Sequence, residues 1–139
     1  RQIEGENGAR FPDFSGLSEK WQTSAEYISV YPNVLLGVQR DHAFAILLIP
    51  DGPENTVEKI HLYYPSNATD AALRAKNTEQ WKGVFKEDVF VVEGMQRGRH
   101  GAQFDGGRFS PVMDSPTHCF HDWTAQNVQA HRTASQKSR

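Results

Sequence analysis

Asp88 is the residue whose surroundings in the sequence point most directly to chemistry. If residues 84–97 form a helix, the neighbours of Asp88 at spacings of three, four and seven are all apolar: Val84, Phe85, Val91, Val92 and Met95. A carboxylate within an apolar stripe faces the core, where it is costly unless it is paired or bound to a metal. This pattern leaves a buried ion pair, a helix cap, a metal ligand and a catalytic acid as possible roles for Asp88.

Several histidines are further candidates for chemistry. His118 and His121 are three residues apart on a predicted helix and could share a metal, although such pairs usually lie on surfaces or interfaces. His42 falls at a predicted turn, where we expect it to be exposed. His100 follows a basic stretch that could bind an anion or a neighbouring subunit, or could be a solvated loop; its nearby arginines are Arg97, Arg99 and Arg108.

The segments that would position these residues are strands first and helices second, which indicates an α+β fold. Residues 27–64 read as β structure, with apolar runs at 34–38, 44–49 and 57–64. Asp41-His42 suits a tight hairpin connection. Because the connections are too short for parallel crossovers, we expect an antiparallel meander. Its central side chains could line a cavity or simply pack in the core: Phe44, Ile46 and Leu48.

Helical periodicity begins after residue 69. Thr69 or Asn67 can cap a helix that starts with Asp70, whose charge suits the first turn. Gly83 either breaks this helix or marks a close packing contact. A second helical stretch then covers residues 84–97.

After a loop at residues 100–113, Ser115 and Pro116 signal the start of a last helix. Its apolar side carries Cys119, Phe120 and Trp123, and a polar tail follows His131. We expect Trp81 and Trp123 to be core aromatics.

Composition excludes several classes of protein. The chain has 139 residues, 37% hydrophobic content and a formal charge of −2, so it has no basic footprint for nucleic acid and no apolar run long enough to span a membrane. Its single cysteine, Cys119, excludes an intramolecular disulfide and a cysteine-rich metal cluster. A reducing compartment, and hence the cytoplasm, is the expected location.

Three segments in order carry a resemblance to a known family. In residues 30–36 (VYPNVLL) a Pro-Asn pair opens a strand, and in residues 87–98 (EDVFVVEGMQRG) Asp88 precedes a helical Glu and Gln. Residues 106–111 (GGRFSP) are followed by a helix that contains residues 121–123 (HDW). The chain resembles the C-terminal part of the catalytic domain of Rieske-type, ring-hydroxylating non-haem iron oxygenase α subunits.

This resemblance implies a fold and a domain organisation. Residues 1–20 would be an irregular lead-in, residues 21–131 the C-terminal portion of the catalytic domain, and residues 132–139 a frayed tail. The implied fold is an α+β helix-grip (START-like) arrangement, in which an antiparallel sheet wraps around a C-terminal helix.

The resemblance also implies that Asp88 is the carboxylate ligand of a mononuclear Fe(II) ion, with Glu93 and Gln96 in supporting or structural roles. The family's two histidine ligands lie close together upstream, and no His-x4-His or His-x5-His pair occurs here. The Rieske 2Fe-2S cluster needs two cysteines and two histidines, so we expect it only in an N-terminal region outside this chain. The iron site is thus incomplete in this chain, which alone should be inactive.

For the full-length protein, the resemblance implies a mono- or dioxygenase that inserts oxygen from O2 into an aromatic or quaternary-ammonium substrate. The implied partners are the remainder of its own α subunit, further copies in a homo-oligomer (a trimer), and a reductase or ferredoxin as electron donor, with no nucleic acid and no membrane. The alternative is a non-catalytic helix-grip module for an apolar small molecule, with Asp88 anchoring a polar group of that ligand.

Overall fold

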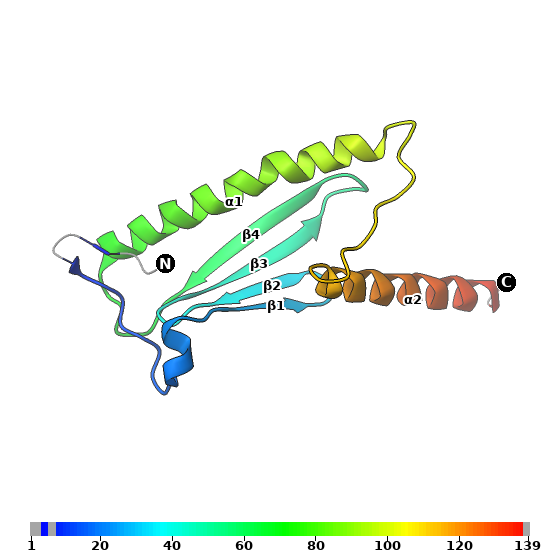
Figure 1. Cartoon of the computed structure of the whole chain (residues 1–139). Coiled ribbons are helices and arrows are strands. Elements are labelled where there is room, and N and C mark those ends of the chain that lie inside the picture. The colour runs from blue at the N-terminus through cyan, green and yellow to red at the C-terminus, as the bar shows by residue number, and fades with distance from the viewer. Residues whose placement is uncertain (1–3, 6–7, 138–139) are drawn as a thin grey trace. The chain divides into compact units, whose positions relative to one another are not determined.

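Four strands form an antiparallel meander in the computed structural model, which describes residues 4–5 and 8–137 (Figure 1). The strands are β1 (Glu26–Val30), β2 (Val34–Val38), β3 (Ala43–Pro50) and β4 (Thr56–Tyr63). Their order in the sheet is β1-β2-β3-β4, and every neighbouring pair is antiparallel. The predicted meander is therefore confirmed.

The connections between the strands are tight turns. Between β2 and β3, the Gln39 amide donates to the His42 carbonyl at 2.9 Å. Between β3 and β4, the Asp51 amide donates to the Asn55 carbonyl at 2.8 Å, and Gly52 takes a φ of 80° that favours glycine. Turns this short hold consecutive strands side by side and fix their register.

One long helix, α1 (Ala71–Arg99), runs along one face of the sheet (Figure 1). Its N-cap is Asp70, whose side chain accepts a hydrogen bond from the Leu73 amide at 3.0 Å, so the predicted caps Thr69 and Asn67 were wrong. Asp70 serves better because its carboxylate precedes the first turn and reaches the free amides there. The predicted break at Gly83 is also wrong, because α1 is continuous, and a side chain there would meet nothing within 4 Å.

Two apolar groups hold this part of the chain together. Phe11, Ala68 and Leu73 form a buried cluster with Tyr64 beside it, so the irregular lead-in is attached to the start of α1. On β3, Phe44 and Ile46 are buried, which confirms their core packing. Part of the predicted lead-in, residues 1–3 and 6–7, lies outside the described residues.

Residues 101–139 form a second compact unit, separate from the unit of residues 1–100. It contains α2 (Ser115–Lys137), which starts at the residue pair expected from the sequence. The helix continues past His131, where the sequence predicted a polar tail. Trp123 is half-buried, whereas Cys119 is exposed and Phe120 is only partly covered, so the apolar side of α2 is not a core within the described part of this unit.

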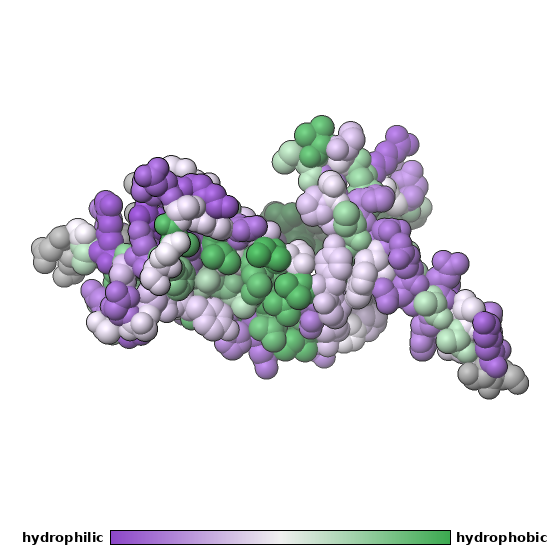
Figure 2. Space-filling view, turned by 90° about the horizontal axis from the view of Figure 1, so that it is seen from below, coloured by the Kyte–Doolittle hydropathy of each residue, from purple (hydrophilic) through white to green (hydrophobic). Residues whose placement is uncertain are grey.

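The arrangement is an α+β fold, as expected for a fragment of a helix-grip catalytic domain. Seen from below, apolar residues gather into a patch over the strands (Figure 2). On the edge strand β1 the exposed apolar side chains are Tyr27, Ile28 and Val30. None of the described helices is long and apolar enough to cross a membrane.

Candidate metal centre

Trp81 and Phe85 identify the side of α1 that faces the sheet. Both rings meet Phe44 of β3 edge-on, with centroids 4.6 Å away for Trp81 and 5.4 Å away for Phe85. The two rings also stack on each other at 5.3 Å. Leu73 and Asn77 precede Trp81 at helical spacing and are buried, so the same side of the helix is covered from its first turns onward.

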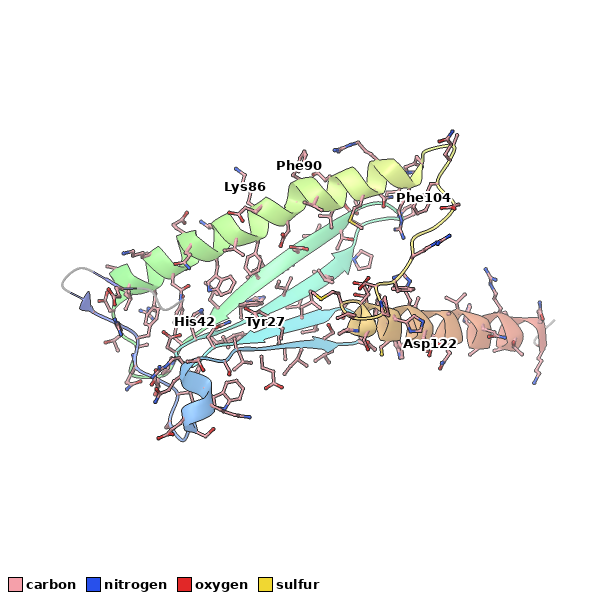
Figure 3. All side chains as sticks on the ribbon, in the orientation of Figure 1. Tyr27, His42, Lys86, Phe90, Phe104 and Asp122 are labelled. Carbon is pink, nitrogen blue, oxygen red and sulfur yellow. The ribbon has the colours of Figure 1, made fainter. Side chains whose placement is uncertain are left out.

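Asp88 projects from this same side, two turns beyond Trp81. Seven residues at 3.6 per turn bring Asp88 to within about 20° of the Trp81 direction and about 10 Å further along the helix. Phe90 is rotated from Asp88 by about 200°, and both Lys86 and Phe90 point away from the sheet (Figure 3). Helix geometry therefore directs the Asp88 carboxylate toward the sheet side.

The carboxylate of Asp88 has no protein partner in the described part of the chain. Among residues 4–5 and 8–137, no side-chain hydrogen bond or ion pair involves Asp88, and Asp70 is the residue that caps α1. A buried ion pair and a capping role are thus not realised in this part of the chain. Sequence reasoning placed Asp88 against the core, but the residue is exposed here.

The apolar side chains around Asp88 are exposed as well. Val84 is 40% exposed, Val92 56% and Met95 65%, because α1 has no layer of described residues packed over this stretch. Phe85, by contrast, is half-buried against Phe44. The sheet-facing side of α1 is therefore covered up to Phe85 and uncovered around Asp88.

One oxygen donor without a partner fits one position of a non-haem iron site. Carboxylate oxygen suits a hard ferrous or ferric ion, and two histidines normally complete the protein ligands. No group of three His, Cys, Asp or Glu residues within the described ranges could hold a metal ion. The described residues thus offer iron at most a partial site, and the ligand role of Asp88 stays a prediction.

A buried polar network lies beside the aromatic contact and was missed from the sequence. His42 is 5% exposed and Asp41 2%, which corrects the expectation that His42 is exposed. The His42 Nδ1 atom lies 2.7 Å from Asp41 Oδ1, and the Trp81 indole donates to His42 Nε2 at 2.9 Å. The hairpin end is buried because α1 covers it with Trp81. In the sequence, the only sign of this network was an acidic residue directly before a histidine.

The remaining predicted candidates form local contacts. His118 and His121 both meet Phe109 edge-on, at 5.0 and 5.1 Å. His100 pairs with Glu54 at 2.9 Å on the surface, between the end of α1 and the β3–β4 turn.

The residues expected to support Asp88 lie further along the same helix and form few contacts. Glu93 pairs with Arg97 at 3.9 Å with both side chains about two-thirds exposed, and Gln96 is half-buried. Arg99 and Arg108 are exposed. Surface pairs of this kind contribute little to stability.

Comparison with known proteins gives the family. The sequence profile described as "Ring hydroxylating alpha subunit (catalytic domain)" matches residues 3–130. A curated relative, the chloroplastic choline monooxygenase of Arabidopsis thaliana, is 30% identical over 108 residues, which cover 77% of this chain and 25% of the relative. The chain thus spans about a quarter of that relative's length. No solved structure matches the chain significantly. The chain therefore belongs to the family of ring-hydroxylating α subunits, within their catalytic domain.

Proposed function

We propose that Asp88 is the carboxylate ligand of the mononuclear iron in a Rieske-type oxygenase of which this chain is a part. The observation that carries the proposal is a carboxylate on the sheet-facing side of α1, inside an apolar stripe, for which the described residues supply no partner. The described structure leaves this carboxylate exposed, but any part of the α subunit that covers the apolar stripe would make an unpaired charge there costly, whereas a bound metal ion would offset that cost. Membership of the ring-hydroxylating family supports iron as the group that this carboxylate serves.

Iron held by two histidines and one carboxylate on one side keeps positions open for dioxygen and substrate. Asp88 contributes a negative charge that lowers the net charge of the site. The helix backbone fixes the direction of its carboxylate, and the aromatic contact of Trp81 and Phe85 with Phe44 holds that helix on the sheet. Val92 and Met95 are exposed here, and they would give the site an apolar border where another part of the α subunit covers them.

The activity of the full-length protein follows from this role. The two histidine ligands and the 2Fe-2S cluster would lie in other parts of the α subunit, since this chain spans a quarter of its relative. Electrons would pass from a reductase or ferredoxin through the cluster to the iron, and the α subunits would assemble as a homo-oligomer, a trimer by family resemblance. A cytoplasmic location stays a prediction.

The substrate would be an organic molecule, either an aromatic ring or a quaternary ammonium compound. The family description supports the first class, and the name of the relative supports the second. Turnover by the full-length protein of a simple arene and of choline, with oxygen uptake and product measured together, separates the two classes and distinguishes mono- from dioxygenation.

The test of the iron role is iron content in the full-length protein. Asp88→Ala should lose most of its bound iron, because one of three protein ligands is removed. Glu87→Ala is the matched control: Glu87 is also an exposed carboxylate, but it is rotated by about 100° from Asp88 on the helix. Equal iron in Asp88→Ala and wild type would contradict the proposal. An iron-free wild type that binds an apolar ligand through Asp88 would favour the binding module instead.

A further inference from the structure

Three side chains join the β2–β3 connection to the middle of α1. Asp41 and His42 are both buried, and the His42 ring lies 2.7 Å from the Asp41 carboxylate through its Nδ1 atom. The other ring nitrogen, Nε2, accepts the indole N–H of Trp81 at 2.9 Å. Figure 3 labels His42 at this end of the sheet. The contact spans 39 residues of sequence and is a polar link between helix and hairpin.

The chemistry of the donors fixes the direction of this network. An indole nitrogen can only donate, so the Nε2 atom of His42 must carry a lone pair. The ring proton of the neutral imidazole then lies on Nδ1, which donates it to Asp41. The order of donation is Trp81 to His42 to Asp41. Each of the three side chains therefore has a defined orientation. Rotation of the Trp81 ring would break its hydrogen bond to His42.

Ring packing holds α1 on the sheet and fixes its rotation only approximately. The contacts of Trp81 and Phe85 with Phe44 are edge-on, an arrangement that aromatic pairs prefer, but they tolerate small rotations better than a hydrogen bond does. The indole hydrogen bond is directional, and its loss would leave the buried His42 Nε2 atom unsatisfied. Among these contacts, the hydrogen bond is the one that selects a single rotation of the helix.

Rotation of α1 about its own axis would move the Asp88 carboxylate. The carboxylate lies about 5 Å from the helix axis, so a turn of about 20° would move it by about 2 Å. Metal–ligand distances tolerate only about 0.2 Å. A small change in rotation at Trp81 would thus remove Asp88 from a coordination position two turns away.

We propose that the Asp41–His42–Trp81 network sets the rotation of α1 and so aims the Asp88 carboxylate at the iron. His42 and Trp81 are then positioning residues for the ligand. The inference rests on the proposed role of Asp88 and adds to it how this chain directs that ligand. The inference predicts that His42 and Trp81, which do not contact the metal, control the affinity and the coordination geometry of the iron site.

The test uses the full-length protein and three substitutions. Trp81→Phe keeps an aromatic ring against Phe44 but removes the N–H donor, and His42→Leu removes the acceptor. His42→Gln keeps an acceptor oxygen near the Nε2 position and should rescue most of the loss. The Fe(II) dissociation constant should rise about 10- to 100-fold in Trp81→Phe and His42→Leu. The visible spectrum of the cobalt(II)-loaded protein, which reports ligand geometry, should change in the same two variants.

Trp21→Phe is the matched control, because it makes the same substitution in the short 3-10 helix Glu19–Gln22, which contributes no residue to the network. It should leave iron affinity and the cobalt spectrum unchanged. If His42→Leu does not fold, Trp81→Phe and His42→Gln still carry the comparison. Wild-type affinity and spectrum in Trp81→Phe would overturn the inference, and so would a His42→Gln variant with the same iron loss as His42→Leu. If Asp88→Ala keeps its iron, the proposed function itself fails. If Asp88→Ala loses its iron but Trp81→Phe keeps wild-type affinity, only the positioning role of the network fails.

Discussion

The Phe44 ring lies against the backbone of Gly37, its cross-strand partner on β2, so closely that a methyl group at Gly37 would overlap the ring. Gly37→Ala should therefore push Phe44 toward Trp81 and destabilise the domain by about 1–3 kcal/mol, as overpacking does. Urea unfolding of the full-length protein measures this loss in the free energy of unfolding, from the transition that belongs to the catalytic domain. An unchanged midpoint would mean that Phe44 can lie elsewhere without cost.

Gly83→Ala should have the opposite effect. Gly83 lies inside α1, where a side chain would meet nothing within 4 Å, and alanine favours a helix over glycine by about 1 kcal/mol. The same unfolding measurement should show stabilisation of roughly that size. A loss of stability would show instead that another segment of the full-length protein packs against Gly83.

Asn77→Leu should stabilise the protein. Asn77 is fully buried on the covered side of α1, and within the described structure neither its amide nitrogen nor its amide oxygen has a hydrogen-bond partner. Removing an unsatisfied buried polar group relieves a penalty of about 1–3 kcal/mol, although leucine must fit the same space. Thermal unfolding should therefore shift upward. A downward shift would mean that the amide binds a group outside the described residues.

The Asp13–Arg40 pair should make stability depend on acid pH. Arg40 donates to Asp13 through Nε at 2.8 Å, and this hydrogen bond lowers the Asp13 pKa below its ordinary value of 3.8. Because the folded pKa is the lower one, the pair stabilises the fold above pH 3.8, and this stabilisation disappears as pH falls through the folded pKa. The effect is small, since both side chains are partly exposed.

Asp13→Asn tests this sign. In the iron-free protein, the variant should be less stable than wild type at pH 7 and equal to it at strongly acid pH, by urea unfolding at each pH. In an Arg40→Gln background, Asp13→Asn should cost much less at pH 7, because the partner is already absent. A constant difference between wild type and Asp13→Asn at every pH would rule out the ion pair as its cause.

The sequence was sufficient for the features that depend on local pattern. The apolar runs and short turns predicted the antiparallel meander, and the apolar spacing around Asp88 predicted the helix side from which it projects. Trp81, expected to be a core aromatic, is half-buried and packs on the core residue Phe44. These features follow from the periods of strand and helix, which adjacent residues reveal.

The features that depend on tertiary contacts could not be predicted from the local sequence pattern. His42 lies at a chain reversal, a position that usually faces solvent, but the rings of Trp81 on α1 and of Tyr64 pack against it and help to bury it. Gly83 was expected either to break the helix or to mark a close packing contact, and it does neither: its cost to the helix is about 1 kcal/mol, which the packing of Trp81 and Phe85 on the sheet offsets. The exposure of Asp88 depends on whatever covers the apolar stripe in the full-length protein, which no local pattern contains.

The most direct measurement is the position of iron relative to Asp88. Crystals of the full-length, iron-loaded protein, with anomalous diffraction recorded at the iron edge, locate the metal independently of any substitution. The account predicts a mononuclear iron within coordination distance of an Asp88 carboxylate oxygen, on the sheet-facing side of α1. An iron ion with a complete set of protein ligands that does not include Asp88 would contradict it.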